Sequence, residues 1–307
     1  MNITAKKEYI NLALIIVHYN NLSDTTDFVN SILEKIDTRL YKIIIVDNFS
    51  PNGSGNELVS TYKDNTKIDV VLLEKNVGVS GGWQAGIDYL RENYVFEFVA
   101  LCNNDLLLID KNLYKCIKEE YVNSDFAALG PMIITSDGRC DDNPIFDVIY
   151  SRENALYDLK YWKRRLKAIK CGFDKIFCFF HNRSPFVKSW KKKHYIKRKL
   201  REPGAFLQKR ENVVLHGCFI VLSPKYFEFF EGIDARTFMY AEEDILFVHI
   251  MVAGLKTVYN PKIAIYHKGG SSVSSSFAND KKKKIFLVNN YIQAIEQYLM
   301  LLDEVGI

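Results

Sequence analysis

The chain has 307 residues, of which 48% are hydrophobic and 25% charged, and its formal net charge is +4. These values describe a globular chain with one large core and an elaboration, and two full domains are possible but not required. The N-terminal stretch MNITAKKEYI lacks an apolar signal core, and runs such as LALIIV are too short to cross a bilayer. Six cysteines without a CxxC pair favour a reduced protein. We therefore expect a cytosolic chain, neither exported nor integral to a membrane.

The first part of the chain alternates predicted strands with predicted helices. Four short apolar runs bounded by polar turns indicate strands at residues 12–17, 42–47, 70–74 and 96–102. Ser23 precedes one helix of apolar residues at helical spacing, and IDYLREN forms another before the fourth strand. Because continuous apolar strands alternate with amphipathic helices, we expect an α/β fold with a mainly parallel sheet covered on both faces.

A basic, aromatic-rich block interrupts this pattern. By count, residues 158–201 carry sixteen Lys or Arg and two Asp, a net charge of about +14. After it, VVLHGCFIVLS and KTVYN indicate strands, with a helix between them that begins near Glu243 and stops at Gly254. The predicted units are therefore an N-terminal half at 1–136, a basic insertion at 137–211, a second half of the same domain at 212–280 and an amphipathic helix at 281–307.

The basic insertion allows several interpretations. It carries no sequence motif of a nucleic-acid-binding module, so we expect no nucleic acid partner. Cys171, Cys178 and His181 lack the fourth ligand and the spacing of a zinc site. Two interpretations stay open: a surface that lies on an anionic membrane leaflet, with cations and aromatic residues at the interface, or a solvated helical insertion that packs on the domain or mediates homo-oligomerisation.

The loops that follow the predicted strands carry most of the informative residues. In open α/β sheets ligands bind outside the carboxyl ends of the strands. The four loops there are HYNN (18–21), DNFSPNGSGN (47–56), EKNVGVSGGWQAG (74–86) and NND (103–105). The glycine-rich loop does not match the GxGxxG pattern and follows the third strand rather than the first, which argues against a dinucleotide-binding dehydrogenase.

Five motifs in one order resemble a known family. The succession of VDNFSPNGS, NVGVSGGWQAG, NND, GIDARTFMYAEED and YHKGGSS resembles the family 2 glycosyltransferases of GT-A fold, close to bacterial rhamnosyltransferase-like members. The resemblance covers about residues 12–275, apart from the basic insertion. It implies a nucleotide-diphospho-sugar transferase fold in which 1–136 binds the donor and 212–280 carries the acceptor and catalytic groups.

The resemblance assigns donor-binding roles to several loop residues. Asp47 would contact the nucleotide base, and a carboxylate can accept the imide N–H of uracil or thymine. Asp47 could instead be the acid of an Asx-turn in a loop rich in Pro, Asn and Gly. Gln84 stands where the family commonly has Asn, so no sugar contact is assigned to it. The other residues placed around the donor are Tyr19, Asn20, Asn76, Gly81 and Gly82.

The NND segment resembles the family's metal motif in a relaxed form. Asp105 would hold Mg²⁺ or Mn²⁺, which take oxygen ligands and neutralise charge on a diphosphate leaving group. Asn103 would contact the donor, and Asn104 would be replaceable. His267 matches a late family histidine that binds metal or pyrophosphate, although a lone histidine after a strand is more often structural. The Ser-rich tract at 271–276 would form a lid.

The segment AEEDIL supplies the candidates for catalysis. Aligned with the family, Glu242 and Glu243 form the acidic pair and Glu243 is the first choice for general base, whereas a shift of one residue makes it Asp244. Acids also favour helix N-termini for stability alone. His216 and Gly217 would lie at the acceptor, and His216 could instead be a structural histidine of the sheet.

These assignments together predict an inverting, metal-dependent hexosyltransferase. Its donor would be a UDP- or dTDP-sugar of rhamnose, galactofuranose, glucose or galactose type. Its acceptor would be a hydroxyl of a lipid-linked or growing cell-surface polysaccharide, reached in the cytoplasm at the inner face of the membrane. The alternative is a non-catalytic membrane- or polymer-binding protein on a degenerate GT-A scaffold, which the relaxed NND and Gln84 favour.

Overall fold

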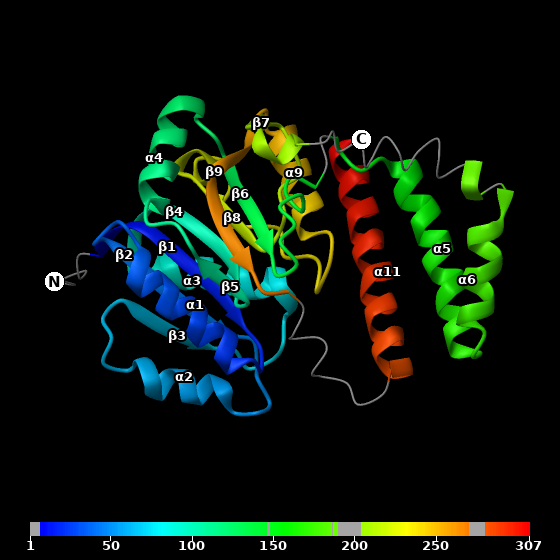
Figure 1. The fold of residues 1–307 in the computed structure, drawn as a ribbon, viewed down its shortest axis with the longest axis horizontal. Coiled ribbons are helices and arrows are strands. Elements are labelled where there is room, and N and C mark those ends of the chain that lie inside the picture. Colours follow the sequence, from blue (N-terminus) through cyan, green and yellow to red (C-terminus); the bar gives the residue numbers. More distant parts are fainter. Residues whose placement is uncertain (1–6, 146–147, 186, 190–203, 270–279) are drawn as a thin grey trace.

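The computed structural model describes residues 7–145, 148–185, 187–189, 204–269 and 280–307. A twisted sheet with helices on both faces forms the body of the molecule, and the helices labelled α11, α5 and α6 extend from one side (Figure 1). The strands are β1 (Glu8–His18), β2 (Tyr41–Asp47), β3 (Ile68–Leu72), β4 (Tyr94–Asn103), β5 (Leu106–Leu108), β6 (Ala128–Thr135), β7 (Arg210–Glu211), β8 (Phe219–Leu222) and β9 (Thr257–His267). The helices are α1 (Leu22–Lys35), α2 (Ser54–Tyr62), α3 (Gly78–Asn93), α4 (Leu113–Ser124), α5 (Arg152–Lys170), α6 (Asp174–Arg183), α8 (Pro224–Phe227), α9 (Glu242–Val252) and α11 (Asp280–Val305), with a 3₁₀ turn at Ala205–Leu207.

The strand order is β3-β2-β1-β4-β8-β6-β9-β5, and β7 pairs with β9. The first four strands in this order run parallel, whereas β8 is antiparallel to β4 and to β6. The predicted mainly parallel, mixed sheet is confirmed. Because β1, β2 and β4 are parallel neighbours, the loops after them meet at one edge.

Both faces of the sheet are covered, as the continuous apolar strands predicted. One core cluster joins the strands to α1, α2 and α4, and the other joins them to α3, α8 and α9. The helix expected after Ser23 begins at Leu22, because the Asn21 side chain caps it by accepting from the Asp24 N–H at 3.2 Å. The prediction placed its start too late.

Two predicted elements are longer than expected. The helix predicted at IDYLREN begins at Gly78, so most of NVGVSGGWQAG lies in the first turns of α3, and its glycines let this helix approach β1 closely. A Cβ built on Gly86 would lie 2.3 Å from the Ile15 Cγ2 atom. The short strand expected at KTVYN continues to His267, because β9 resumes pairing with β6 after a register shift at Pro131/Met132.

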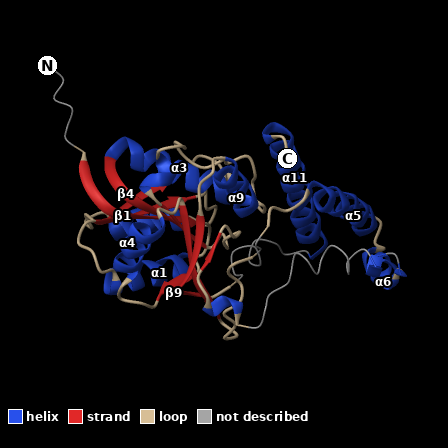
Figure 2. Cartoon of the chain, turned by 90° about the horizontal axis from the view of Figure 1, so that it is seen from above, coloured by secondary structure: helices blue, strands red, loops and turns tan. Residues whose placement is uncertain are grey.

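Helices of the basic insertion pack against the C-terminal helix. Helix α11 lies between α9 and α5, and α6 covers the far side of α5 (Figure 2). The Trp162 and Tyr291 rings meet at 4.9 Å, and the Lys163 Nζ atom lies 2.7 Å from a Glu296 carboxylate oxygen. None of the described helices is long and apolar enough to cross a membrane.

Candidate functional site

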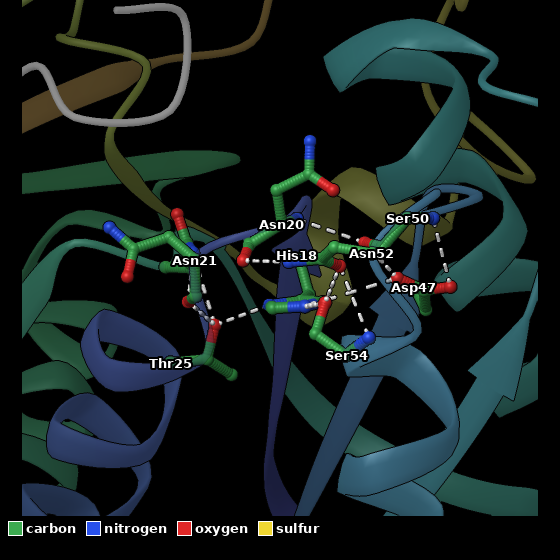
Figure 3. Close-up of polar contacts among 9 residues, drawn as sticks. His18, Asn20, Asn21, Thr25, Asp47, Ser50, Asn52 and Ser54 are labelled. Atoms are coloured by element: carbon green, nitrogen blue, oxygen red, sulfur yellow. Dashed lines mark hydrogen bonds and ion pairs between the residues drawn. The ribbon is translucent and has the colours of Figure 1, made fainter. Parts of the chain in front are cut away.

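The loop after β2 is built around Asp47, which is buried (Figure 3). Its carboxylate accepts from the Ser50 backbone N–H at 3.2 Å and from the Ser50 hydroxyl. This is the Asx-turn that the sequence offered as the alternative role of Asp47. Each carboxylate oxygen has more than one acceptor position, so Asp47 retains capacity for a ligand N–H.

Two residues beside Asp47 have left-handed backbone conformations. Asn20 and Phe49 both have φ near 62°, a conformation that costs energy for residues other than glycine and is concentrated at functional sites. The Asn20 amide points away from its neighbours in Figure 3, and its buried Oδ1 atom has no hydrogen-bond partner among the described residues. Phe49 is 54% exposed and was not foreseen from the sequence. Tyr19, next to Asn20, is partly exposed.

His18 was also missed, although it connects these loops. Its ring is fully buried at the end of β1, with Nδ1 2.6 Å from the Thr25 hydroxyl and Nε2 2.8 Å from the Ser54 hydroxyl. Burial lowers its pKa to about 4, against a smaller opposing effect of Asp47, and keeps the imidazole neutral. A histidine at the carboxyl end of an apolar strand was the available signal.

The residues predicted to wall the donor hold the start of α3 in place. The Asn76 side chain accepts from the Gly78 N–H at 3.0 Å. Cβ atoms built on Gly81 and Gly82 would lie 2.8 Å from Val77 and 2.9 Å from Val17, so both positions require close packing.

Asn48 and Gln84 are further polar residues that fix this region. Asn48 donates to the Gly78 carbonyl oxygen at 2.8 Å and accepts from Val77 N–H at 2.8 Å, which joins β2 to α3. Gln84 accepts from the Ile233 N–H at 2.7 Å. Gln84 therefore fixes the segment before α9, which gives a structural reason for this departure from the family pattern.

Asp105, which follows β4, lies beside His267, the last residue of β9. The Asp105 Oδ1 atom lies 3.3 Å from His267 Nε2, and the Lys268 N–H donates to the Asp105 carbonyl oxygen at 2.9 Å. The His216 ring centre is 6.0 Å from that of His267. Within the described part of the chain, no three or more His, Cys, Asp or Glu residues form a metal cluster. One carboxylate and one imidazole still fit a cation that takes its other oxygen ligands from a diphosphate and water.

Asn104, which was predicted to be replaceable, makes a structural contact. The side chain is buried and its Nδ2 donates to the Thr25 hydroxyl at 3.0 Å. An aspartate carboxylate has no N–H to donate, so the amide has a structural reason. The neighbouring Asn103 is partly exposed, and its backbone N–H donates to the Cys218 carbonyl oxygen at 2.9 Å.

The acids at the start of α9 lie beside the segment that precedes β8. A Cβ built on Gly217 would lie 3.5 Å from Glu243 Oε2. Burial, together with the charges of Glu242 and Asp244, raises the pKa of Glu243 to about 8. His216 Nδ1 accepts from the Cys218 N–H at 3.1 Å, so its proton lies on Nε2.

Glu242 is directed differently from Glu243. It lines a small pocket with Ser80, Trp83 and Asp234, and its buried Oε1 atom has no hydrogen-bond partner among the described residues. Burial raises the pKa of Glu242 to about 7. The preceding Ala241 has φ of 63°, so α9 begins from a strained turn.

Asp234 anchors the segment between β8 and α9 and was not given a role from the sequence. It accepts from His249 Nε2 at 2.9 Å and from Arg236 Nε at 2.7 Å. Although burial alone would raise the pKa of Asp234, these donors hold it at about 2. Arg236 also donates to the Glu304 carboxylate at 2.8 and 3.2 Å, which ties this segment to α11. The predicted Ser-rich lid at 271–276 lies outside the described residues.

Residues 13–229 match the sequence model of glycosyl transferase family 2, which is more than half of the chain. The comparison with curated proteins found no match. GalNAc-T7, solved with UDP, GalNAc and Mn²⁺, is 12% identical and superposes with a TM-score of 0.55 over 94% of this chain and 48% of its own.

TarS from S. aureus gives similar values. Its fragment 1–349 is 12% identical, with a TM-score of 0.51 over 94% of this chain and 72% of that one. In its complex with UDP the match is 19% identical, with a TM-score of 0.38, over 45% of this chain and 40% of that one. This chain thus spans 40% to 72% of the length of these solved chains. At this identity the superpositions with GalNAc-T7 and with the TarS fragment 1–349 show the fold, and the predicted GT-A architecture is confirmed.

Proposed function

Because this chain belongs to glycosyl transferase family 2, we propose that it transfers a sugar from a UDP- or dTDP-sugar to an acceptor hydroxyl, with inversion. One observation supports this most strongly: the backbone N–H of Asn103, at the end of β4, donates to the carbonyl oxygen of Cys218, just before β8. This bond holds the segment of Asp105 beside the segment of Gly217. The Asp105–His267 pair and Glu243 thereby lie near the same strand ends.

Each group then has a chemical role. Asp105 and His267 would hold Mg²⁺ or Mn²⁺, and when bound the cation would neutralise charge on the diphosphate as it leaves. Glu243 takes the proton of the acceptor hydroxyl, whose oxygen forms a bond to the anomeric carbon. The bond from this carbon to the diphosphate oxygen breaks on the opposite face, so the configuration inverts. Gly217 leaves space for the acceptor beside Glu243.

A panel of nucleotide sugars with Mn²⁺ tests this function directly. We expect a UDP- or dTDP-sugar to raise the melting temperature of the full chain only when the divalent cation is present. The best stabilising donor would then be supplied with lipid-linked and polysaccharide acceptors to detect transfer. Stabilisation without transfer to any acceptor would favour a binding protein on the same scaffold, and no stabilisation by any donor would contradict the proposal.

The pKa of Glu243 predicts the pH dependence of transfer. A general base must be ionised, and the pKa of this carboxyl is raised to about 8. We therefore expect kcat/KM to rise with pH up to about 8. The stability contribution has the opposite sign, since a raised pKa favours the folded state at low pH and loses this effect as pH rises. In a Glu243→Gln variant, kcat/KM should no longer rise with pH in this range. If the rise is unchanged, another group is responsible for it.

Phe49 provides a second prediction, for the nucleoside. An exposed aromatic ring beside Asp47 can stack on a base, and such stacking contributes about 1–3 kcal/mol. We expect Phe49→Ala to weaken UDP binding by about five- to 100-fold in calorimetry, and Phe49→Tyr to retain it. Phe229→Ala, which removes an equally exposed ring elsewhere, serves as the control. Equal UDP affinity in Phe49→Ala and the native chain would exclude stacking.

The acceptor side of the proposal includes a cytoplasmic membrane surface. Helix α6 has no buried residue, and its exposed apolar side chains are Ile176, Phe179 and Phe180, with Phe173 exposed just before it. The Arg183 guanidinium lies 3.7 Å from the Phe179 ring centre, so cation and aromatic residue share this face. Since α6 is the outermost helix and the insertion is strongly basic, an anionic bilayer fits it better than a second copy of equal charge (Figure 2).

Vesicle sedimentation tests this surface. We expect binding to phosphatidylcholine vesicles that contain phosphatidylglycerol, loss of binding at high salt, and at least about tenfold weaker binding for Phe180→Ser. Phe229→Ser is a matched control, since Phe229 is 53% exposed and also lies near a cation, Lys225. Equal binding of Phe180→Ser and the native chain, or no binding at low salt, would contradict membrane docking through α6.

A further inference from the structure

A continuous series of polar side chains joins the loop after β4 to the loop after β2, and Figure 3 shows its part from Thr25 to Asn52. Asn104 Nδ2 donates to the Thr25 hydroxyl at 3.0 Å, and this hydroxyl lies 2.6 Å from His18 Nδ1. On the other side of the ring, His18 Nε2 lies 2.8 Å from the Ser54 hydroxyl, which lies 2.7 Å from Asn52 Oδ1. His18 is the centre of the series, and the two ends lie at the proposed metal loop and the proposed nucleoside loop.

The neutral imidazole of His18 allows two arrangements of these hydrogen bonds, since one ring nitrogen donates and the other accepts. In the first, Nε2–H donates to Ser54, whose hydroxyl donates to Asn52, and Nδ1 accepts from Thr25. In the second, Nδ1–H donates to Thr25, whose hydroxyl donates to the Asn21 carbonyl oxygen at 3.1 Å. Ser54 then donates to Nε2 and no longer to Asn52. The first arrangement therefore keeps the bond from Ser54 to Asn52 and loses the bond from Thr25 to the Asn21 carbonyl oxygen, and the second arrangement does the reverse.

From this series we propose that His18 is a positioning residue that makes nucleoside binding and divalent-cation binding cooperative. The inference rests on the proposed function, which places the two ligands at the two loops. A nucleoside that engages the loop of Asn52 favours one tautomer of His18. The tautomer decides whether the Thr25 hydroxyl donates to His18 or to the Asn21 carbonyl oxygen, and this reorients the hydroxyl that accepts from Asn104, the residue before Asp105. By linkage, the cation favours the nucleoside by the same factor.

The ends of the series support this role over simple packing. Asn52 is exposed, and its Nδ2 donates to the Asn20 carbonyl oxygen at 2.8 Å, so the series opens onto the proposed nucleoside pocket. At the other end Asn104 is buried and adjoins Asp105. An apolar side chain at position 18 would fill the same space without any of these bonds, but it could not transmit a change from one loop to the other.

Uridine is the probe that isolates the effect, because it has no phosphate and cannot contact the cation directly. We expect saturating Mn²⁺ to tighten uridine binding to the full chain by about fivefold in calorimetry. Thr25→Val, which removes the hydroxyl but keeps the shape, should bind uridine and show no tightening. Thr25→Ser should restore the tightening, and the exposed Thr61→Val is the matched control.

A spectroscopic measurement accompanies the titration. The ¹⁵N chemical shifts of the His18 ring report its tautomer, and uridine should change them in the native chain. If Mn²⁺ does not alter uridine affinity in the native chain, or alters it equally in Thr25→Val, cooperativity through His18 is refuted. If UDP with Mn²⁺ does not bind at all, the donor site itself is refuted and the inference falls with it. Loss of stability alone would lower the melting temperature of Thr25→Val without removing the tightening.

Discussion

Glu243→Gln should lower the rate of sugar transfer by about 10²- to 10⁴-fold while leaving donor affinity unchanged. The amide keeps the shape of the side chain but cannot take the acceptor proton. Glu243 is the favoured base because its carboxylate lies beside Gly217, where the acceptor is proposed to bind, whereas Glu242 lines an inner pocket. Single-turnover kinetics with saturating donor would separate the chemical step from binding.

Matched amide variants of the neighbouring acids complete this test. Asp244→Asn and Glu242→Gln should retain more transfer than Glu243→Gln, and the exposed Glu231→Gln should have the native rate. If Asp244→Asn is the variant that loses transfer, the base is Asp244 and the alignment is shifted by one residue. If none of the three loses it, general-base catalysis by this acidic segment is wrong.

Asp105→Ala should remove the dependence of donor binding on a divalent cation and lower kcat/KM by about 100-fold or more. The reason is that a bound cation contributes several kcal/mol of charge stabilisation to a leaving diphosphate. His267→Ala should have a smaller effect in the same direction, because Asp105 would remain as an oxygen ligand. Titration of UDP at varied Mn²⁺ would measure the loss directly.

The control for this prediction is the exposed Asp64→Asn, which removes one negative charge far along the chain from the motif. Its donor binding should depend on Mn²⁺ as in the native chain. Donor binding by Asp105→Ala that still responds to Mn²⁺ would place the cation elsewhere. If the native chain bound the donor equally well with and without Mn²⁺, the Asp105–His267 pair would be a structural contact rather than a metal site.

The architecture was predictable because strand and helix periodicity is a local property of sequence. The alternation of apolar runs and amphipathic helices, with loops of polar residues after the strands, located the sheet edge correctly. The start of α1 was missed because Ser23 and Asn21 are both good capping residues, and only the fold shows which side chain reaches an N–H. The end of β9 depended on pairing with β6, which periodicity cannot report.

The candidate site was predictable only where a motif was available. Asp105 and His267 were paired from the family resemblance, and they do lie in contact. His18 and Asn104 gave no such signal, because their roles arise from partners distant in sequence. Thr25, for example, lies 79 positions before Asn104 and becomes its partner only when α1 packs beside β5. Gln84 was noticed as a departure, but its partner Ile233 is 149 positions away.

The salt bridge between Arg236 and Glu304 has a consequence for folding kinetics. It belongs to the contacts of α11, and these join distant parts of the chain, as Arg152 and Asp303 do across 151 positions. The sheet depends on contacts that are more distant still, since Leu106 of β5 pairs with His267 of β9, 161 positions away (267 minus 106). Loop closure has to precede both kinds of contact, so we expect the sheet and the attachment of α11 to form in one slow, cooperative step. During refolding, tryptophan fluorescence and sugar transfer should then recover together.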